Sequence, residues 1–473
     1  MKVLFASAEV KPFAASGGLG DVAGSLPQAL RKRFIGCRVV MPLYACVGDE
    51  YRQKMTFLGS IVVPVAWRRQ YCGVFEYRQD GVIYYFIDNE YYFKREGLYG
   101  HYDDAERFAF FSRAVLEIIP LIGFKPDIIH CNDWQTALTP VYYSCIYATL
   151  PGYENIKTVY TIHNIQYQGK YGDEVLENVV GLSVYDKHVL EYDDCVNFMK
   201  GAIETADRVT TVSPSYAEEI LDPWYSHGLD GILRQRAWKL RGILNGISYT
   251  VYDPATDQNI YENYDAADAS GKAENKAKLQ ARFGLPVRPE VPLFAMVTRL
   301  VDHKGLDLVK AVLEDFIRYN DAQFVVLGSG EWEYERFFSD MAGRYPDNVG
   351  VTLGFIPELA SKIYAGSDVF LMPSKSEPCG LSQMIALRYG SVPIVRETGG
   401  LRDSVFDSGL GEGNGFTFSN YNAHDMLHAM ERAVEGYQDK DGWAILRRRA
   451  MECDYSWKRS AGEYIDLYKE LLK

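Results

Sequence analysis

Short apolar runs bounded by turns alternate along most of the chain with longer stretches in which apolar residues recur at helical spacing. This alternation predicts βαβ units and a parallel sheet, because parallel strands are joined by helical crossovers. The pattern occurs in two series. The first predicts strands over residues 2–7, 38–41, 83–87, 128–131, 157–162 and 208–212. The second predicts strands over residues 293–298, 323–327, 349–353, 369–372 and 392–395.

The two series predict two α/β domains. Residues 242–254, which lie between the series, are rich in turn formers, and residues 265–283 form a polar stretch with helical composition. We therefore expect an N-terminal domain over residues 1–245 and a C-terminal domain over 246–455. Residues 456–473 carry an apolar stripe near helical spacing and are expected to form a closing helix.

Composition narrows the class of partner. The 473 residues are 47% hydrophobic and 24% charged, as in a compact globular protein. A net charge of -13 opposes binding to nucleic acid or to an anionic membrane, but leaves a neutral carbohydrate possible as a partner. The eight cysteines include no CxxC pair, so no zinc cluster or disulfide framework is expected. We expect a cytoplasmic protein, since neither a secretion signal nor a stretch of about 20 apolar residues is visible.

Two loops with the pattern GGLxD occupy residues 17–21 and 399–403, each before a helical stretch. Glycines let a backbone approach a ligand closely, and the N-terminus of a helix favours an anion. The plainer interpretation is two ordinary strand-to-helix turns. Because the loops occur as a pair, one in each series, we favour a ligand bound in a cleft that the two domains share.

Three charged residues follow predicted strands of the second domain. Arg299 and Lys304 come after the strand at 293–298, where two cations can hold a diphosphate and stabilise it as it leaves. The alternative is a solvated basic pair. Glu377 follows the strand at 369–372 and precedes a helix, so its carboxylate can bind sugar hydroxyls. The alternative is that it complements the helix dipole.

In the first domain, Asp133 and Trp134 follow the strand at 128–131, and His163 and Asn164 follow the strand at 157–162. Ends of parallel strands meet at one edge of a sheet, so these pairs should lie near the first glycine loop. A lone histidine is more often structural, but three converging strand ends favour a site. No Ser-His-Asp order or metal-ligand spacing occurs, which favours group transfer without a metal.

Aromatic residues are abundant, and an aromatic face suits the apolar side of a glucose ring. Most of them are expected in the core. Tyr92, Arg95, Tyr99 and Tyr102 lie in the polar segment 88–102, which we predict to form a lip on the acceptor side.

Together, several motifs resemble those of bacterial glycogen synthases and plant starch synthases, and the resemblance spans essentially the whole chain. It is carried by SGGLGDV from Ser16, DWQ from Asp133, TIHN from Thr161, LNG from Leu244, RLVDHK from Arg299, EPCGL from Glu377 and TGGL from Thr398. The resemblance implies a GT-B fold, with two Rossmann-like, doubly wound domains facing a deep interdomain cleft. It also implies retaining transfer of glucose from ADP-glucose, a co-substrate, to the non-reducing end of an α-1,4-glucan, with no cofactor and no metal.

The resemblance also implies residue roles. Arg299 and Lys304 would neutralise the departing diphosphate, Glu377 would engage the donor glucose, His163 would contact the donor sugar and Asp133 would position sugar groups. The implied substrate-binding residues are Ser16, Gly17, Gly18, Asp21, Asn164, Asn245, Cys379, Gly380, Leu381, Thr398, Gly399, Gly400 and Leu401. The implied mechanism is a front-face displacement in which the leaving phosphate helps to deprotonate the acceptor.

The chain departs from the family pattern at three positions. Ala15 replaces a lysine that contacts the diphosphate, Gln135 replaces a histidine, and the usual aromatic after Gly354 is Phe355, so that a tyrosine hydroxyl sometimes present there is absent. Loss of one charge-assisted hydrogen bond, about 1.5–3 kcal/mol, would lower binding or rate roughly ten- to a hundredfold, unless the nearby Lys11 substitutes. Two alternatives therefore stay open. One is a GT-B transferase with UDP-glucose or another acceptor, and the other is a catalytically impaired glucan-binding or regulatory homologue.

Overall fold

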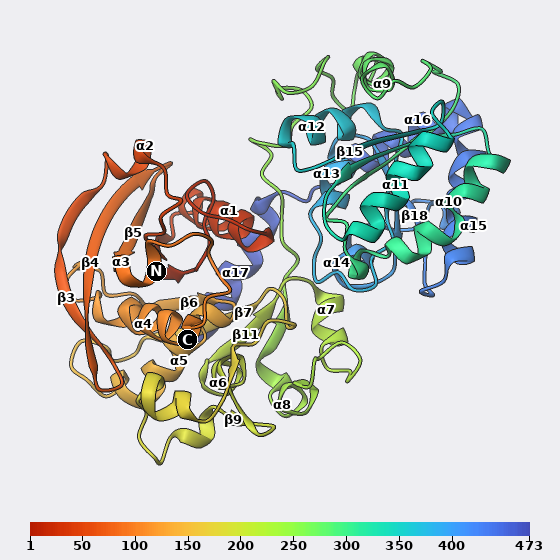
Figure 1. Cartoon of the computed structure of the whole chain (residues 1–473). Helices are drawn as coiled ribbons and strands as arrows, with labels where there is room; N and C mark the ends of the chain where they lie inside the picture. The colour runs from red at the N-terminus through yellow and green to blue at the C-terminus, as the bar shows by residue number, and fades with distance from the viewer. The chain divides into compact units, whose positions relative to one another are not determined.

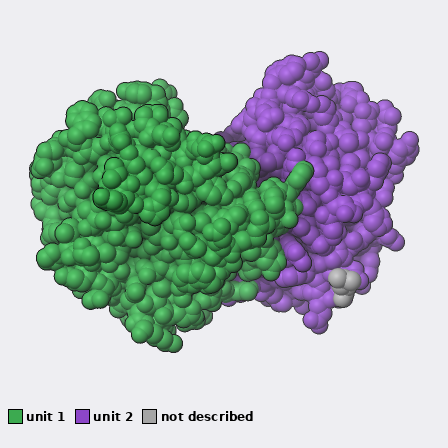
Figure 2. Space-filling view, turned by 90° about the horizontal axis from the view of Figure 1, so that it is seen from below, with its two compact units in different colours: residues 1–245, 457–473 green, residues 246–456 purple. Residues whose placement is uncertain are grey.

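The computed structural model describes residues 1–473 with the exception of the side chain of Leu410. It divides into two compact units, coloured separately in Figure 2. Unit 1 comprises residues Met1–Asn245 together with Trp457–Lys473, and unit 2 comprises Gly246–Ser456. The last helix of the chain therefore belongs to the first unit.

A nine-stranded sheet forms the centre of unit 1 in the described residues, with the order β12-β11-β7-β6-β1-β2-β5-β4-β3. Its strands are β1 (Lys2–Ala6), β2 (Gly36–Pro42), β3 (Thr56–Val65), β4 (Arg68–Gln79), β5 (Val82–Asp88), β6 (Ile128–Asn132), β7 (Lys157–Ile162), β11 (Arg208–Thr211) and β12 (Leu240–Gly242). Pairing is parallel from β12 to β5. Strand order changes direction between β1 and β6, which makes this position a topological switch point.

The edge of this sheet is a long antiparallel hairpin formed by β3 and β4, which the sequence pattern did not predict. Its strands mix exposed, half-buried and a few buried positions, so they lack the continuous apolar runs that identify buried strands. A small antiparallel sheet, β8 (Lys170–Tyr171), β9 (Glu191–Tyr192) and β10 (Cys195–Asn197), was also not predicted.

The helices of unit 1 are labelled in Figure 1. They are α1 (Gly18–Lys32), α2 (Asp49–Arg52), α3 (Glu90–Phe93), α4 (Asp104–Glu117), α5 (Leu138–Tyr142), α6 (Phe198–Thr205), α7 (Pro214–Glu219), α8 (Asp230–Gln235) and α17 (Trp457–Leu471). Helix α17 packs beside α1 and anchors in the sheet, since the Tyr468 hydroxyl lies 2.6 Å from Nδ1 of the buried His130 on β6.

Unit 2 is a six-stranded parallel sheet in the described residues, with the order β15-β14-β13-β16-β17-β18. Its strands are β13 (Leu293–Val297), β14 (Gln323–Gly328), β15 (Val349–Leu353), β16 (Val369–Met372), β17 (Val392–Arg396) and β18 (Phe416–Phe418). Its helices are α9 (Gly271–Arg282), α10 (Leu306–Tyr319), α11 (Trp332–Arg344), α12 (Pro357–Gly366), α13 (Ser382–Arg388), α14 (Gly399–Ser404), α15 (Ala423–Gln438) and α16 (Lys440–Glu452). The order reverses between β13 and β16, so each unit has one such switch point.

Every strand predicted from the sequence is present, with its ends shifted by at most two residues. The core of unit 2 explains why: buried apolar residues of β13, β14, β16 and β17 pack against those of α10, α11, α15 and α16. No helix in the described part of the chain is both long enough and apolar enough to cross a membrane.

Candidate active site

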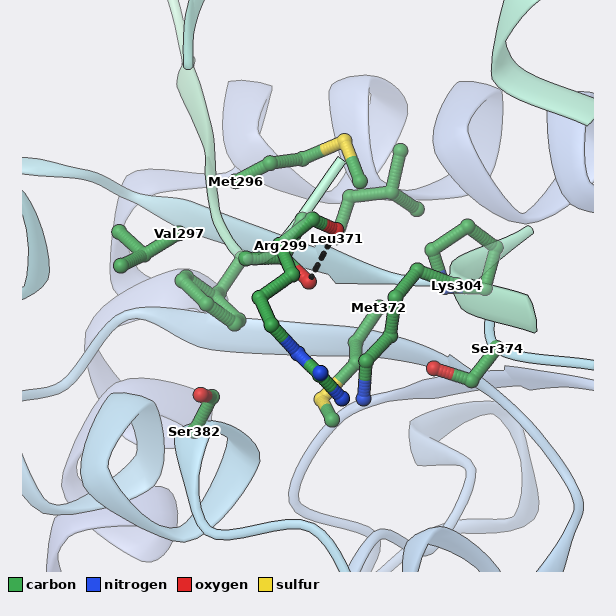
Figure 3. A pocket seen from close by; sticks show the side chains of 11 residues that line it. Met296, Val297, Arg299, Lys304, Leu371, Met372, Ser374 and Ser382 are labelled. Atoms are coloured by element: carbon green, nitrogen blue, oxygen red, sulfur yellow. Dashed lines mark hydrogen bonds between the residues drawn. The ribbon is translucent and has the colours of Figure 1, made fainter. Parts of the chain in front are cut away.

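The switch point of unit 2 holds the predicted cations. The loops that follow β13 and β16 lie at this point, and ligands of doubly wound folds bind at such switch points. A pocket of about 170 Å³ lies between them, lined by Arg299, Lys304, Ser374 and Ser382 together with strand residues of β13 and β16. In Figure 3 the side chains of Arg299 and Lys304 extend in the same direction, and both end in nitrogen atoms.

Two of the three predicted charged residues of unit 2 form an ion pair. Lys304 Nζ lies 2.6 Å from Oε2 of Glu377, which also accepts a hydrogen bond of 3.0 Å from the Ser374 hydroxyl. Glu377 is buried. Arg299 is exposed, and its side chain has no hydrogen-bond or ion-pair partner among the described residues, so its guanidinium can bind an anion.

The two loops of this pocket are tightly packed on each other. A Cβ on Gly305, whose φ is +74°, would lie 2.1 Å from the carbonyl oxygen of Pro373. The Lys375 N–H donates to the carbonyl of His303 over 3.0 Å. Lys304 and Glu377 are therefore held in place by backbone contacts as well as by their own ion pair.

Cys379, Gly380 and Leu381 continue the Glu377 loop into α13. Gln383 organises this turn, because its Nε2 donates to the carbonyls of Cys379 and Gly380 over 3.0 and 2.9 Å. Gly380 has a φ of +71°, a conformation that favours glycine. Cys379 is buried in this turn, with an exposed fraction of 6%.

The second glycine loop packs on the Glu377 loop. A Cβ on Gly399 would lie 2.1 Å from the carbonyl oxygen of Glu377, and one on Gly400 would lie 2.1 Å from that of Cys379. Thr398 and Leu401, at either side, have no exposed surface. We expected these glycines to let the backbone approach a ligand. In the structure, the group that approaches them closely is the backbone of the Glu377 loop, which leaves no room for a side chain.

Arg396, at the end of β17, braces the same region. Its Nε donates to the Ser374 carbonyl over 3.0 Å and its Nη2 to the Lys375 carbonyl, while Nη1 donates to Ser419 over 3.4 Å. The guanidinium is buried and faces the Tyr421 ring. Arg396 thus ties the strand before the second glycine loop to the segment before Glu377.

The switch point of unit 1 holds the first glycine loop. A Cβ on Gly17 or Gly18 would have no atom within 4 Å, so the space beside these glycines is open. The backbone N–H groups of Ser16 and Gly17 donate to Oε2 of Glu9 over 2.6 and 3.2 Å, and the Ser16 hydroxyl donates to Oε1 over 2.7 Å. Tyr99 donates its hydroxyl to the same Oε1 over 2.7 Å. The buried carboxylate of Glu9 therefore orders the loop.

Asp21 lies in the first turn of α1, where a negative charge complements the helix dipole. Lys11 Nζ lies 2.7 Å from its Oδ1, and both side chains are partly exposed. The one cation close to this loop in sequence is thus paired with Asp21.

Asp133 follows β6 in an unusual backbone conformation, with φ 56° and ψ -179°. This region is essentially restricted to glycine, so the surrounding structure must stabilise the residue. Its Oδ1 accepts the N–H groups of His163 over 2.7 Å and of Asn164 over 3.4 Å. Burial raises the pKa of the Asp133 carboxyl to about 7, although these two hydrogen bonds act to lower it. Asp133 therefore positions the backbone after β7.

The His163 side chain is partly buried at the end of β7, and burial lowers its pKa to about 3. Its Nε2 lies 2.9 Å from Oδ1 of Asn132. At neutral pH the imidazole is uncharged. Asp133, His163 and Asn164 are thus brought together as predicted.

Asn245, at the end of unit 1, is buried, and its Oδ1 has no hydrogen-bond partner within the described residues. An unsatisfied buried oxygen costs roughly 1–3 kcal/mol, so this group is available to a ligand.

The predicted lip of tyrosines is wrong for two of its residues. Tyr92 is completely buried and donates to Glu106, and Tyr99 points inward to Glu9. Arg95 forms a bidentate ion pair with Asp103. Only Tyr102 of this group is largely exposed, at 90%. The polar composition of the segment concealed these inward contacts.

A second pocket, of about 430 Å³, lies in unit 1 and includes Trp134, the residue after Asp133. It is lined by Trp134, Gln166, Tyr167, Gln168, Gly169, Lys170, Tyr171 and His227. The exposed ring of Tyr167 and the side chain of Trp134 give it aromatic walls, and its amide and amino groups offer hydrogen bonds.

Sequence reasoning missed Glu9 and Arg396. Each is a charged residue at the end of an apolar strand or within three residues of it, and within ten residues of a glycine loop. A charge at such a position is a usable signal, because a charged group is seldom buried without partners.

Comparison with known proteins identifies the family. The model of the starch synthase catalytic domain matches residues 2–235, and that of group 1 glycosyl transferases matches residues 278–448. Glycogen synthase from Geobacillus thermodenitrificans is 53% identical over 100% of this chain and 98% of its own length. That from Desulforamulus reducens is 51% identical over 100% and 99%. This chain belongs to the glycogen and starch synthase family.

Solved structures agree with this membership. The catalytic domain of starch synthase IV from Arabidopsis thaliana, bound to ADP and acarbose, matches with a TM-score of 0.92 and 36% identity over 100% of this chain and 99% of that one. Sucrose-phosphate synthase from Thermosynechococcus elongatus shares the fold, with a TM-score of 0.60 and 18% identity over 99% and 98%. The predicted GT-B fold and the predicted glycogen synthase type of hexosyltransferase are confirmed. Membership of this family implies a nucleotide sugar and a glucan as substrates.

Proposed function

We propose that this glycogen synthase homologue transfers glucose from ADP-glucose to the non-reducing end of an α-1,4-glucan, with retention of configuration. The unpaired Arg299 beside Lys304 at the switch point of unit 2 carries the proposal, since two cations there can hold a diphosphate. The ADP bound in the starch synthase IV structure supports adenine as the base. We place the reaction in the cytoplasm and expect it to need no metal or other cofactor.

In the proposed step, the bond between C1 of glucose and the β-phosphate oxygen breaks, and a bond from C1 to O4 of the acceptor forms on the same face. The acceptor proton passes to the departing phosphate, and ADP leaves. Arg299 and Lys304 neutralise the charge that develops on the diphosphate. Glu377 binds donor hydroxyls, His163 contacts the donor sugar and Asp133 positions the His163 backbone. The aromatic pocket beside Trp134 is the candidate place for acceptor glucose units.

Release of ADP and UDP should be measured from ADP-glucose and UDP-glucose, with glycogen as acceptor. We expect glycogen-dependent release of ADP at a kcat/KM at least about tenfold above that for UDP. A preference for UDP-glucose would replace the proposed donor. Absence of release from either donor would favour a glucan-binding protein without synthase activity.

The residue roles need matched variants. Arg299→Ala and Glu377→Ala should each lower kcat/KM by roughly a hundredfold or more, because each removes a charged contact to the transition state. Arg318→Ala and Glu333→Ala are the controls, since both residues form exposed ion pairs on α10 and α11. Unchanged activity in the first pair would show that the assigned roles are wrong.

A further inference from the structure

Asn132 is the last residue of β6 and contacts His163. The role assigned to it rests on the proposed contact between His163 and the donor sugar. Asn132 is buried. Its Nδ2 donates to the carbonyl of Ala6 over 3.0 Å and to that of His130 over 3.4 Å. Two carbonyl oxygens on one side of the amide require the amino group there, because the amide oxygen would be repelled. The oxygen of Asn132 therefore faces His163.

This orientation fixes the proton on the imidazole. Asn132 Oδ1 lies 2.9 Å from His163 Nε2 and can only accept, so Nε2 must carry the proton. Since burial keeps the ring neutral, Nδ1 is unprotonated. No protein group in the described residues hydrogen-bonds to Nδ1. The lone pair of Nδ1 is thus the one free polar position of the ring.

We propose that Asn132 is a positioning residue that holds His163 as the neutral Nε2–H tautomer, so that Nδ1 accepts a hydrogen bond from a hydroxyl of the donor sugar. His163 then acts as an acceptor and supplies no proton to the reaction. An imidazolium would present N–H groups at both nitrogens, so Nδ1 could no longer accept from the hydroxyl.

Other titratable groups lie close to the ring. Burial lowers the pKa of His130 on β6 to about 3, and a charge on the nearby His163 would lower it further. The Asp133 carboxyl binds the His163 backbone N–H, and Glu9 lies near Asp133. Any pH test must therefore include a variant that separates the titration of Asp133 from that of His163.

The tautomer can be measured directly. The full-length protein is labelled with ¹⁵N-histidine, and the signals of His163 are assigned by their loss in His163→Gln. We expect a protonated signal for Nε2 and an unprotonated signal for Nδ1 at pH 8. A proton on Nδ1 would overturn the inference, whatever the donor of the enzyme proves to be.

Asn132→Asp tests the role in catalysis. A carboxylate beside Nε2 raises the pKa of His163, so the charged ring accumulates as pH falls. We expect kcat/KM for ADP-glucose, relative to the parent enzyme, to fall about fivefold or more between pH 8 and pH 6. In the double variant Asn132→Asp/His163→Gln this additional loss should vanish, since Asp133 still titrates but residue 163 no longer does.

Asn275→Asp is the matched control. Asn275 on α9 is also buried, donates through Nδ2 to the carbonyls of Glu262 and Gly271, and accepts through Oδ1 from Tyr261 N–H. It should lose stability without a pH-dependent loss of activity. The role of Nδ1 would be overturned if the kcat/KM of Asn132→Asp relative to the parent enzyme stayed constant from pH 8 to pH 6 while NMR showed that His163 becomes protonated. Inactivity of the parent enzyme with ADP-glucose would instead contradict the proposed function.

Discussion

The backbone N–H of Gly400 donates to the carbonyl oxygen of Glu377 over 3.2 Å, and it shares this proton with the carbonyl of Pro378. The second glycine loop is therefore part of the support beneath the proposed donor-binding carboxylate. The first glycine loop has no such neighbour, because the space beside Gly17 and Gly18 is open. Two loops with the same pattern of residues thus have different physical reasons for their glycines.

Alanine substitutions should separate these reasons. Gly400→Ala places a Cβ 2.1 Å from a carbonyl oxygen and should cost roughly 1–3 kcal/mol of unfolding free energy or more. Gly18→Ala should change stability by no more than about 0.5 kcal/mol, yet raise the KM for ADP-glucose, because the methyl group enters the open space. Urea unfolding and initial rates measure both effects. Equal stability losses in the two variants would contradict the distinction.

Glu9→Gln should loosen the first loop. The carboxylate accepts four hydrogen bonds, from Ser16, Gly17 and Tyr99, and an amide offers only one acceptor oxygen for them. We expect a loss of roughly 1–3 kcal/mol in stability and a higher KM for the donor. Tyr99→Phe removes one of these bonds and should have a smaller effect on KM. If Glu9→Gln keeps the parental KM, the loop is ordered by other contacts.

Arg396→Met should weaken the Glu377 loop, because it leaves the carbonyls of Ser374, Lys375 and Ser419 without their donor. We expect kcat to fall about tenfold or more. Arg396→Lys keeps a cation but not the planar fork, so its kcat should be intermediate. Arg344→Met, on the exposed end of α11, serves as the control. A full recovery by lysine would show that charge alone matters.

Asp133→Asn should stabilise the protein in a pH-dependent manner. The folded-state pKa is raised to about 7, so between the ordinary pKa of 3.8 and 7 the folded state keeps a proton that the unfolded state has lost. The carboxyl thus costs stability increasingly as pH rises through this range. The melting temperature of the variant should exceed that of the parent by more at pH 8 than at pH 4.5. A difference that is equal at both values would refute the raised pKa.

Ala15→Lys should raise kcat/KM for ADP-glucose about tenfold, because it restores a cation that Lys11 does not supply while it is paired with Asp21. Residue 15 is exposed, so the longer side chain can be accommodated. Ala15→Met adds similar length without charge and should give no gain. If Lys11→Met costs tenfold and Ala15→Lys gains nothing, Lys11 already acts as the missing cation.

The sequence predicted the strands that are buried on both faces, because their apolar runs are continuous, and β13, β14, β16 and β17 are examples. It could not predict β3 and β4, whose pattern mixes exposed and buried positions. Strand ends also predicted that Asp133 and His163 lie together. The positions of Glu9 and Arg396 mark them as charged residues near the glycine loops, but the partners of Asn132 and Arg396 could not be predicted, because both donate to backbone carbonyls that are distant in sequence.

Helix α17 belongs to unit 1 although it follows unit 2 in sequence, so the order of synthesis affects the folding of unit 1. His130 in the centre of the first sheet has its partner in Tyr468, and Leu244 receives a hydrogen bond of 2.6 Å from Ser460. During synthesis these partners are translated after all of unit 2. The unit whose translation begins first is therefore completed only after the second unit has been translated, and the part of β6 that α17 covers stays uncovered until α17 has left the ribosome.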